Sequence, residues 1–551
     1  MHEIRCEPLP AVDLAAVRCI QGKDVIAAQY APYLADESKM PGQGADYLFF
    51  PASEAEVGAV MTAMAALGVK VTISGARTGI AGGAVPFGGA LMSLDRLDKP
   101  LGLRFDEPTT EWRLVCQPSV TLTDLGDWIK KKAFPGLTER GSKETLAALE
   151  AFRDDGKTYF YPPDPTEMSA FLGGTVATNA SGSISYKYGA TRQWIRRLRV
   201  VLASGEVLDV PRGRYAASTE GTFVVVHGDG RRTTVKLPSY APPRARKNTA
   251  GLFNAPGMDL IDLFIGCEGI LGTITEVEVA LAEWHGTVSV IQFLPDDEAA
   301  IDFVVALREG LSADDRLRPE FVEFYDGHAL DMLRGRQRDN PKALDLPRIP
   351  DDAGAAIFFD VKFDPGAGPD GLDYSLLETA VKRCGSSFAN SWASYERRDY
   401  ARFKHFRHAL PETVNATIGL RKKQYPSLHK LGTDIAVSDE HLKEIWHLYR
   451  DTLETTGLEW VAFGHIGDNH FHVNIMPRNP EDLAKGLEIY TAFAKKAVAM
   501  GGTVSAEHGI GKMKKKFLSV MFSAAELEQM KAVKRAFDPA DTLNPGNILD
   551  M

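Results

Sequence analysis

The spacing of apolar residues in the early part of the chain changes from that of a helix to that of a strand. Ser53 and Glu56 form a capping-box start. The apolar side chains that follow recur every three or four residues and mark one helix face: Val57, Val60, Met61, Met64 and Leu67. Gly68 ends this predicted helix, and short strands are predicted at 69–73 and 90–94.

Residues 74–83, SGARTGIAGG, join these two strands and have few side chains to pack. Backbone N–H groups that stay exposed in such a loop can bind an anion, so the loop is a candidate phosphate site. It lacks the Gly-Lys-Ser/Thr ending of a P-loop and the helix that opens at the third glycine of a dinucleotide fingerprint. A glycine-rich turn without a ligand is the alternative interpretation.

The pattern continues as mixed α and β structure. A strand is predicted at 112–116, a helix at 123–132, and hairpins at 199–210 and 223–237. The charged, glycine-containing residues 138–157 predict a surface excursion. From about residue 282 strands and helices alternate over longer stretches, with strands at 288–293, 320–325 and 356–363 and helices at 297–311 and 376–384. The stretches 339–355 and 364–372 are predicted to be loops, so a second, α+β domain is expected here.

Composition narrows the function class. A chain of 551 residues is long enough for more than one core, and its formal net charge of −10 argues against nucleic acid as a partner. The run Lys512, Lys514, Lys515 and Lys516 predicts a solvated helix face. The five cysteines are scattered and unpaired in spacing, which favours reduced thiols over disulfides or a metal ribbon. No apolar run reaches the length of a membrane span, and a cytoplasmic location is expected, with attachment to the inner face of the membrane left open.

A histidine-rich stretch carries the most specific chemistry. In residues 464–477, GHIGDNHFHVNIMP, strand alternation puts Phe471, Val473 and Ile475 on one face and His470, His472 and Asn474 on the other. A turn at 467–469 can bring His465 back to the side of His472. Glu507, in SAEHGIG at 505–511, would complete a two-histidine, one-carboxylate set suited to a catalytic divalent metal, most simply zinc. Hydrogen-bonded histidines without a metal are the alternative.

Five motifs then indicate a family: SGARTGIAGG at 74–83, PPDP at 162–165, GGTVATNASG at 173–182, YGATR at 188–192 and GCEGILGTITE at 266–276. In this order they resemble the FAD domain of vanillyl-alcohol-oxidase-type flavoproteins. The resemblance implies that residues 74–79 wrap the FAD pyrophosphate, with Arg77 either pairing with a phosphate or pointing into solvent. The implied cofactor residues are Ser74, Gly75, Ala76, Arg77, Thr78, Gly79, Gly82, Pro163, Asp164, Gly174, Thr178, Ser181, Gly189, Glu268, Gly272, Ile274 and Asn544. No His or Cys lies in the glycine loop, which favours noncovalent FAD.

The C-terminal motifs resemble the D-lactate, glycolate and D-2-hydroxyglutarate dehydrogenase branch of these flavoproteins. That branch usually has HxGDGNxH, whereas this chain has Asn469 for the second glycine and His470 for the asparagine. Asn tolerates the left-handed turn, but His470 could enter the metal shell. By position, Arg407 and Lys430 resemble the substrate-carboxylate contacts of that branch. Beside the metal set His465, His472 and Glu507, we expect His508 to be the general base, and Asn474, on the reactive strand face, to orient the substrate or the metal. Pro411 stands near the position of a further polar substrate contact, so the distal group of the substrate is not readable.

The expected fold is therefore α+β: a two-subdomain FAD-binding fold plus an α+β cap domain with an antiparallel sheet, and a C-terminal segment that returns to the FAD domain. The division is 1–45 as an N-terminal extension, 46–281 as the FAD domain with an insertion at about 211–260, 282–500 as the substrate domain, and 501–551 as a segment that completes the active site.

The expected activity is FAD-dependent oxidation of a D-2-hydroxy acid. Electrons would pass to a quinone, a cytochrome or an electron-transfer flavoprotein, and a homodimer is left open. The rival interpretations are a metal-independent flavin oxidase or transferase and a metal-dependent hydrolase.

Overall fold

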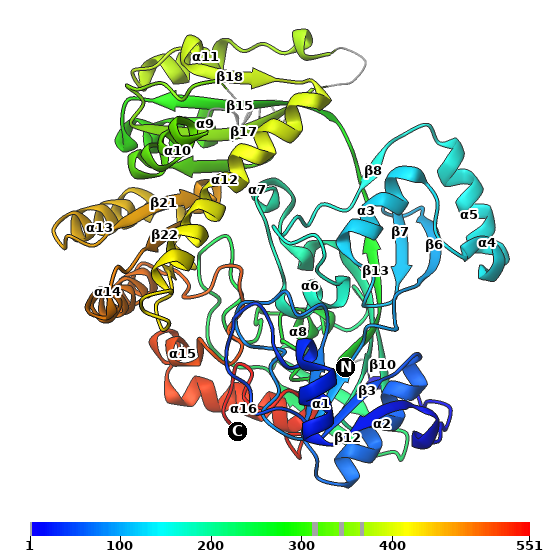
Figure 1. The fold of residues 1–551 in the computed structure, drawn as a ribbon. Coiled ribbons are helices and arrows are strands. Elements are labelled where there is room, and N and C mark those ends of the chain that lie inside the picture. The colour runs from blue at the N-terminus through cyan, green and yellow to red at the C-terminus, as the bar shows by residue number, and fades with distance from the viewer. Residues whose placement is uncertain (1–2, 311–317, 341–346, 364–367) are drawn as a thin grey trace.

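The computed structural model describes residues 3–310, 318–340, 347–363 and 368–551. It has two parts, a lower one in Figure 1 that contains both chain ends and an upper one built from the middle of the chain. The end of the predicted helix 297–311 and parts of the predicted loops 339–355 and 364–372 lie outside the described residues.

A small sheet forms one half of the lower part. Its strands are β2 (Arg18–Gln21), β3 (Tyr47–Phe50), β5 (Ala90–Ser93) and β4 (Val71–Ser74), in the order β2-β3-β5-β4. β3 and β4 both run parallel to β5, which lies between them. β4 thus ends at the glycine loop, so the sheet presents that loop at its carboxyl edge. Helix α1 (Lys23–Gln29) packs near β2 and β3.

Helix α2 (Glu54–Ala66) confirms the helix predicted before the loop. The Ser53 side chain accepts a hydrogen bond from the Glu56 backbone N–H at 3.2 Å and caps the helix. The residues Val57, Val60, Met61 and Met64 are fully buried, as the stripe predicts. Leu67, however, is 66% exposed, because the helix has already ended and the chain turns at Gly68 with a φ of 65°.

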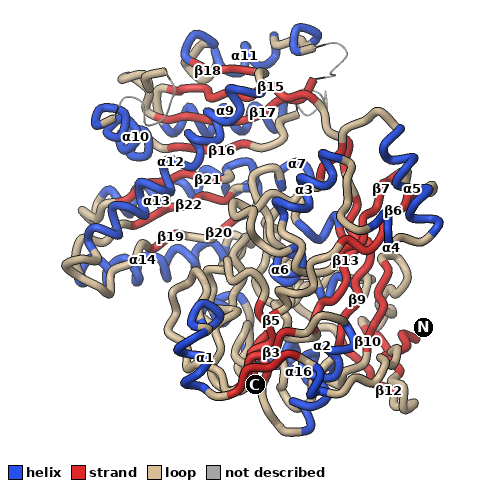
Figure 2. The backbone as a smooth tube through the Cα atoms, turned by 45° about the vertical axis from the view of Figure 1, so that its right-hand side comes forward, coloured by secondary structure: helices blue, strands red, loops and turns tan. Residues whose placement is uncertain are grey.

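An antiparallel sheet forms the other half of the lower part (Figure 2). Its order is β10-β9-β13-β7-β6, with β6 (Pro100–Asp106), β7 (Glu111–Cys116), β9 (Ile195–Val201), β10 (Val207–Pro211) and β13 (Thr273–Ala280). The connecting helices are α3 (Leu122–Lys131), α6 (Leu172–Thr178), α7 (Ser185–Tyr188) and α8 (Ile261–Phe264). A short pair, β8 (Tyr159–Phe160) and β14 (Ala282–Glu283), leads to the upper part. The glycine-rich loops of both sheets face the space between them.

Residues 138–157 are not the surface excursion that their charge suggested. They contain the end of α4 (Leu137–Arg140) and the whole of α5 (Lys143–Asp154), and Leu149 and Phe152 are buried in the core. Phe152 packs edge-on against Trp112 of β7, with ring centroids 4.9 Å apart. The prediction failed because a three-turn amphipathic helix needs few apolar residues to bury one face.

The predicted insertion at 211–260 contains the hairpin β11 (Thr222–Val226) and β12 (Arg232–Lys236). β1 (Glu3–Arg5), at the N-terminal end of the described chain, runs parallel to β11 and extends this hairpin to a small sheet. After β12 the chain leaves the sheet, and residues 244–249 pass beside the loop that carries Glu507. The insertion therefore reaches the candidate site.

The upper part is built on one antiparallel sheet, as predicted. The strand order is β18-β15-β17-β16-β21-β22-β19, with β20 also paired to β22. The bounds are β15 (Gly286–Leu294), β16 (Val322–Tyr325), β17 (Ala355–Phe363), β18 (Ser391–Ser394), β19 (Leu431–Gly432), β20 (Ile435–Ala436), β21 (Trp460–Gly464) and β22 (His470–Ile475). β21 and β22 form the hairpin that carries the histidine motif.

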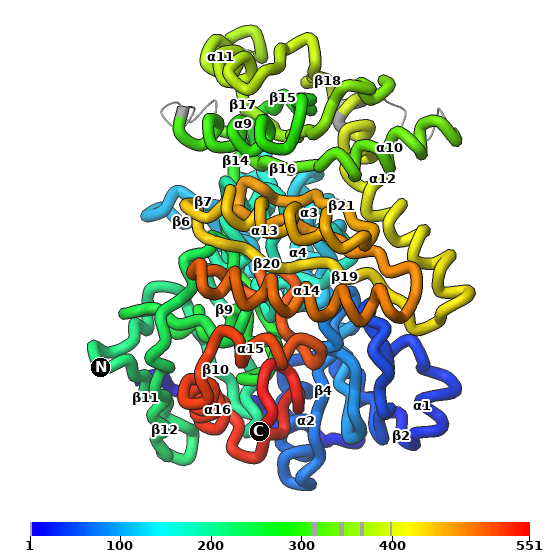
Figure 3. Tube along the Cα trace, turned by 90° about the vertical axis from the view of Figure 1, so that its left-hand side faces the viewer, coloured from blue at the N-terminus to red at the C-terminus, as the bar shows by residue number. Residues whose placement is uncertain are grey.

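Helices cover both faces of this sheet. They are α9 (Asp297–Gly310), α10 (Gly327–Asp339), α11 (Ser375–Arg383), α12 (Arg397–Arg421), α13 (Leu442–Glu454) and α14 (Pro480–Ala499). α13 and α14 lie in front of β20 and β19 in Figure 3. Tyr449 of α13 and Phe493 of α14 pack against each other, and Tyr449 also contacts Phe471 of β22. α12 packs on the other face, where Val414 joins a cluster with Val461 of β21.

The C-terminal segment returns to the lower part, as predicted. After α15 (Lys515–Met521) and α16 (Ala524–Phe537), the chain lies alongside β4 with Leu543 bridged in parallel to Val71. Val71 N–H donates to Thr542 O at 2.7 Å, and Asn544 N–H donates to Val71 O at 2.8 Å. Residues 501–515 thereby connect the large sheet to the glycine loop.

Candidate active site

A cavity of about 380 Å³ lies where the glycine-rich loops meet, within the size range of cofactor sites. It is lined by most of the predicted cofactor residues: Gly75, Ala76, Arg77, Thr78, Gly79, Gly174, Thr178, Ser181, Glu268, Gly272, Ile274 and Asn544. Glu507 and His508 belong to the same lining, so the cavity extends to the residues predicted for catalysis. The walls are rich in backbone and small side chains, which suits close approach of a flat ligand with a pyrophosphate.

The remaining predicted cofactor residues lie outside this lining: Ser74, Gly82, Pro163, Asp164 and Gly189. Asp164 instead holds the next loop, since it accepts hydrogen bonds from Ser183 Oγ at 2.9 Å and Ile184 N–H at 3.2 Å. Gly189 ends α7 with a φ of 76°. Asp164 and Gly189 thus fix the backbone around α7, next to the cavity-lining Ser181.

Arg77 lines the cavity and does not point freely into solvent, one of the two possibilities considered for it from the sequence, and pairing with a phosphate stays a prediction. Its backbone adopts the left-handed conformation with a φ of 63°. The guanidinium lies 3.3 Å from Asp95 Oδ1 and stacks on the Tyr33 ring at 4.5 Å, and its side chain is only 20% exposed. In this structure the charge of Arg77 is therefore paired within the protein, and the backbone N–H groups of the loop remain available for an anion.

Asn544 and Glu268 hold the cavity together. Asn544 Oδ1 accepts from Ile73 N–H at 2.6 Å, and its Nδ2 donates to Glu268 O at 2.8 Å. The Glu268 carboxylate accepts from the N–H groups of Ile510 at 2.6 Å and Gly511 at 2.7 Å. Glu268 therefore fixes the turn that follows His508.

The histidine motif folds as the spacing predicted. β21 ends at Gly464, and residues Ile466–Asp468 form a single turn that ends at Asn469 with a φ of 54°. Asn469 thus takes the left-handed position of the glycine it replaces. Phe471, Val473 and Ile475 are fully buried in the core, whereas His472 is turned to the opposite side.

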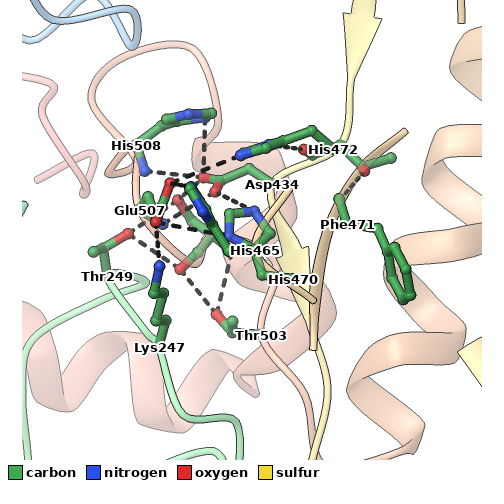
Figure 4. Close-up of polar contacts among 12 residues, drawn as sticks. Lys247, Thr249, Asp434, His465, His470, Phe471, His472, Thr503, Glu507 and His508 are labelled. Carbon is green, nitrogen blue, oxygen red and sulfur yellow. Dashed lines mark hydrogen bonds and ion pairs between the residues drawn. The ribbon is translucent and has the colours of Figure 1, made fainter. Parts of the chain in front are cut away.

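His465, His472 and Glu507 converge (Figure 4). Glu507 Oε2 lies 3.5 Å from His465 Nε2 and 3.9 Å from His472 Nε2. Two ligands of a tetrahedral zinc at 2.0–2.1 Å are about 3.3 Å apart, so the two separations from Glu507 would have to shorten by roughly 0.2 and 0.6 Å for the groups to share an ion. Each imidazole also has a second contact, because His465 Nδ1 lies 3.3 Å from Glu323 Oε1 and His472 Nδ1 lies 3.4 Å from Thr433 O. Such outer contacts orient ligating histidines and leave Nε2 free to bind.

The electrostatics of this cluster favour a cation. Burial and the neighbouring His465 lower the pKa of His472 to about 3, so its Nε2 carries a free lone pair at neutral pH. Burial alone would lower the pKa of His465, but Glu507 and Glu323 raise it to about 8. Burial would raise the pKa of Glu507, yet His465 and Lys247 hold it well below its ordinary value.

A second cluster does not fit an ion equally well. Cys6, Glu206 and His227 also bring ligand atoms together near the small sheet of β1, β11 and β12. However, His227 Nδ1 and Glu206 Oε2 are hydrogen-bonded directly at 2.7 Å, well inside the separation of about 3.3 Å that a shared zinc imposes. The same histidine contacts Thr233 Oγ1 through Nε2 at 3.0 Å. This group is a closed hydrogen-bond network.

His470, the departure from the family motif, lies beside the convergent set. Its Nε2 is 3.4 Å from Asp434 Oδ1, and its Nδ1 is 3.9 Å from Glu507 Oε1, the oxygen that faces away from the other two histidines. Complete burial lowers the pKa of His470 well below its ordinary value. The neutral His470 ring therefore lies between the carboxylates of Asp434 and Glu507.

His508 is oriented by a carboxylate that the sequence reasoning did not single out. Asp434 is fully buried and accepts hydrogen bonds from the N–H groups of Glu507 at 3.0 Å and His508 at 3.1 Å, and from Ser505 Oγ at 2.7 Å. His508 Nδ1 lies 3.4 Å from Asp434 Oδ2. Burial would raise the pKa of Asp434, but His508 and Lys514 hold it far below its ordinary value. Asp434 lies four residues after the predicted contact Lys430 in the stretch KLGTD, which was the available signal.

The lysine run is not a solvated helix face. Lys514 Nζ lies 2.7 Å from Asp434 Oδ2. Lys512 Nζ donates to Asn547 Oδ1 at 2.7 Å and to the carbonyl of Gly83 at 3.2 Å. Only the later residues of the run fall in α15, so the helical interpretation of Lys512 and Lys514 was wrong. The ammonium groups of Lys512 and Lys514 therefore stabilise the turn between His508 and the glycine loop.

The predicted substrate contacts lie on different sides of the site. Arg407 of α12 donates through Nε to Glu323 Oε1 at 2.7 Å, so it stands behind His465 with only 18% of its side chain exposed. Lys430 has its pKa lowered by burial, and its charge acts on His508. Asn474 is buried and donates to the carbonyl of His472 at 2.9 Å.

The predicted insertion adds Lys247, which nothing in the sequence had marked. Its ammonium group lies 2.5 Å from Glu507 Oε1 and 3.0 Å from Asp468 Oδ2, and only 3% of the side chain is exposed. Burial would lower the pKa of Lys247, but the two carboxylates raise it overall, so it is a buried cation.

Comparison with known proteins identifies the family to which this chain belongs. Residues 286–548 match the family described as FAD linked oxidases, C-terminal domain, and residues 45–149 and 144–211 match the FAD binding domain. The chain therefore belongs to the FAD-linked oxidases, and it is an FAD-dependent oxidoreductase. This confirms the family and the cofactor domain predicted from the glycine-rich motifs.

Individual relatives are distant but extend over nearly the whole chain. A D-2-hydroxyglutarate dehydrogenase of Xanthomonas citri pv. viticola is 26% identical over 517 residues, which cover 91% of this chain and 88% of that protein. A D-lactate dehydrogenase of Anaerostipes hadrus is 27% identical over 512 residues, with coverage of 90% and 88%. Among solved structures, an alkyldihydroxyacetonephosphate synthase matches with a TM-score of 0.57 at 14% identity, covers 98% of this chain and 88% of its own, and shows the shared fold. In the described residues no helix is both long and apolar enough to cross a membrane.

Proposed function

We propose that this protein oxidises a D-2-hydroxy acid to the 2-oxo acid, with FAD as the hydride acceptor and a divalent metal, most simply zinc, at His465, His472 and Glu507. The observation that carries the proposal is that Glu507 and the Asp434-oriented His508 line the cavity built from the FAD-domain loops, and that His465 and His472 converge on Glu507. The relatives named above, a D-2-hydroxyglutarate dehydrogenase and a D-lactate dehydrogenase, support the same substrate class.

When bound, FAD supplies hydride acceptance and the metal supplies polarisation of the substrate hydroxyl. The protein then has to align the substrate and move one proton. His508 is placed to accept the proton of the substrate hydroxyl, since its Nδ1 faces Asp434 and its ring lines the cavity. Its pKa is lowered chiefly by burial, so the ring is neutral at pH 7 and Nε2 can accept the hydroxyl proton.

Asp434 has the role of holding His508 in one tautomer and stabilising the imidazolium that forms. Its own pKa is held so low that it stays ionised throughout. The same carboxylate accepts the N–H groups of Glu507 and His508, so the presumed ligand and the base are fixed by one buried anion. We assign the substrate carboxylate to the side of Lys430, whose positive charge lowers the pKa of His508, and keep Arg407 as a charge behind His465.

The test is an anaerobic one. Purified protein is mixed with a panel of D- and L-2-hydroxy acids, and loss of the oxidised flavin absorbance is followed. Rapid bleaching by one or more D-acids and not by their L-enantiomers is expected. A flavoprotein that none of these acids reduces would refute the proposal.

The metal is tested separately from the substrate class. Elemental analysis of active protein is expected to show one divalent ion, and dialysis against a chelator should abolish flavin reduction until the ion is returned. Full activity without metal would favour the metal-independent flavin oxidase or transferase considered above. The hydrolase alternative is set aside, because the chain belongs to the FAD-linked oxidases. The cytoplasmic location, the homodimer and the electron acceptor stay predictions from the sequence.

A further inference from the structure

We propose that Lys247 is a positioning residue that restricts Glu507 to a single ligand oxygen and so keeps coordination positions open for the substrate. The inference rests on the proposed metal at His465, His472 and Glu507, and it gives the insertion at 211–260 a role in the reaction.

The two oxygens of Glu507 face different partners. Oε1 lies 2.5 Å from Lys247 Nζ and accepts a hydrogen bond from Ser181 Oγ at 3.1 Å. Oε2 lies 3.5 Å from His465 Nε2 and 3.9 Å from His472 Nε2. A carboxylate whose Oε1 is held by an ammonium group and a hydroxyl can offer only Oε2 to an ion.

Lys247 is itself held in place from three directions. Its Nζ donates to Gly182 O at 2.7 Å and pairs with Asp468 Oδ2 at 3.0 Å, in addition to Glu507. Asp468 belongs to the turn that returns His465 to the site, and Gly182 follows the loop that lines the cavity. Figure 4 shows Lys247 rising from the insertion segment towards Glu507. The ammonium group thus cannot move to Oε2 without losing two other partners.

The rest of the segment is fastened to the loop that carries Glu507. Thr249 N–H donates to Ser505 O at 2.8 Å, and Gly509 N–H donates to Thr249 Oγ1 at 3.2 Å. Arg244 N–H donates to Gly501 O at 2.9 Å. Hydrogen bonds before and after Lys247 in the segment therefore fix its position relative to Glu507.

The restriction of Glu507 to one oxygen affects how many coordination positions on the metal stay open for the substrate. A catalytic zinc keeps three protein ligands and leaves room for the reacting molecule. If Glu507 bound through both oxygens, it would occupy a position that a chelating carboxylate and hydroxyl need. Removing the nearby positive charge should also strengthen, not weaken, attraction of the site for a cation.

The experiment uses Lys247→Met in the flavin-loaded full chain, with Lys236→Met as a matched control. Lys236 is exposed on β12 of the same insertion, so its loss tests the change of charge without touching the site. Cobalt(II) is titrated into metal-free protein, and its visible spectrum is recorded beyond the flavin absorption. KM and kcat are measured with the best D-2-hydroxy acid, and Lys247→Arg tests rescue by a retained charge.

For Lys247→Met we expect cobalt bound at least as tightly as in the wild type, a weaker cobalt absorption that indicates a higher coordination number, and a KM raised by about tenfold or more with a smaller change in kcat. Lys247→Arg should restore part of the spectrum, and Lys236→Met should match the wild type. Should Lys247→Met fail to retain flavin, Lys247→Gln keeps a donor for Gly182 and should shift the spectrum in the same direction.

Three results would overturn the inference. An unchanged spectrum and KM would show that Lys247 does not limit Glu507, and the proposed function would stand. A large loss of cobalt affinity would show that the lysine merely supports the fold of the site. A wild-type protein that takes up no cobalt and reduces its flavin with hydroxy acid would remove the metal, and this inference with it, but would keep the oxidation.

Discussion

Replacing His508 by Asn tests the division of labour between two adjacent residues, Glu507 as ligand and His508 as base. The side chain can be changed with little structural cost, because 30% of it is exposed and, among the described residues, its ion-pair contact is with Asp434 at 3.4 Å. Asp434 keeps Lys514 at 2.7 Å and Ser505 Oγ at 2.7 Å, so it stays paired after the change. The Asn amide can also donate where Nδ1 did.

The loss should therefore fall on proton transfer. Removal of a general base commonly costs about 10²- to 10⁴-fold, which is roughly 2.7–5.5 kcal/mol of barrier. Flavin content and metal content should match the wild type. The deficit should shrink as pH rises, because the substrate hydroxyl then needs less help to lose its proton.

The assay is single-turnover flavin reduction by the best substrate, measured from neutral to alkaline pH in the wild type and the variant. His429→Asn is the control, since His429 is exposed and its Nδ1 lies 3.1 Å from the carbonyl oxygen of Ser427, a neighbour in sequence. An unchanged reduction rate would show that His508 is not the base. A variant that keeps its flavin but has lost its metal would show that the roles of Glu507 and His508 are exchanged.

Further predictions concern the cofactor, the metal and stability. Gly79→Asp should lose FAD while Gly79→Ala keeps it, because a Cβ at Gly79 meets nothing within 4 Å and only the added charge opposes a phosphate; equal flavin content in both would place the phosphate elsewhere. Glu507→Gln, His465→Ala and His472→Ala should each lose metal and flavin reduction yet retain flavin. If the flavin of one variant is still reduced at the normal rate, the residue replaced in that variant is not a metal ligand. Burial and the neighbouring Glu320 raise the pKa of Asp360 to about 8, so the folded state binds a proton that the unfolded chain releases near pH 4, and stability should fall as pH rises towards 8. Asp360→Asn should flatten that fall in thermal unfolding measured between pH 5 and 9 (roughly the window of the shift), and parallel curves for variant and wild type would contradict it.

Several features were readable from local sequence because they depend on short-range geometry. The stripe from Val57 to Met64 predicts the buried face of α2, since helix period and burial coincide there. Alternation in β22 separates Phe471 from His472, and Asn469 can turn the chain because its side chain tolerates a positive φ. Five short motifs in order, three of them rich in glycine, indicated the FAD-linked family, which the family matches confirm.

Other features depend on residues that meet only after folding. Leu67 continues the apolar stripe in sequence but lies beyond the helix end, and α5 buries a face that its charge concealed. Lys514 looked like part of a solvated run and instead neutralises Asp434, 80 positions earlier. No local pattern distinguishes such a lysine from a surface one, because its desolvation is balanced by a carboxylate from another element.

The composition of the site and its arrangement thus have different origins. Residue types and spacing along β22 and the loop at 505–511 determine which groups are available: two imidazoles, a carboxylate and a base. Tertiary structure decides how they are used, since Glu323 lies behind His465, Asp434 lies behind His508, and Lys247 reaches Glu507 from 260 positions away. The physical reason is that a buried charge is tolerated only beside its partner, and the fold alone determines which partners become neighbours.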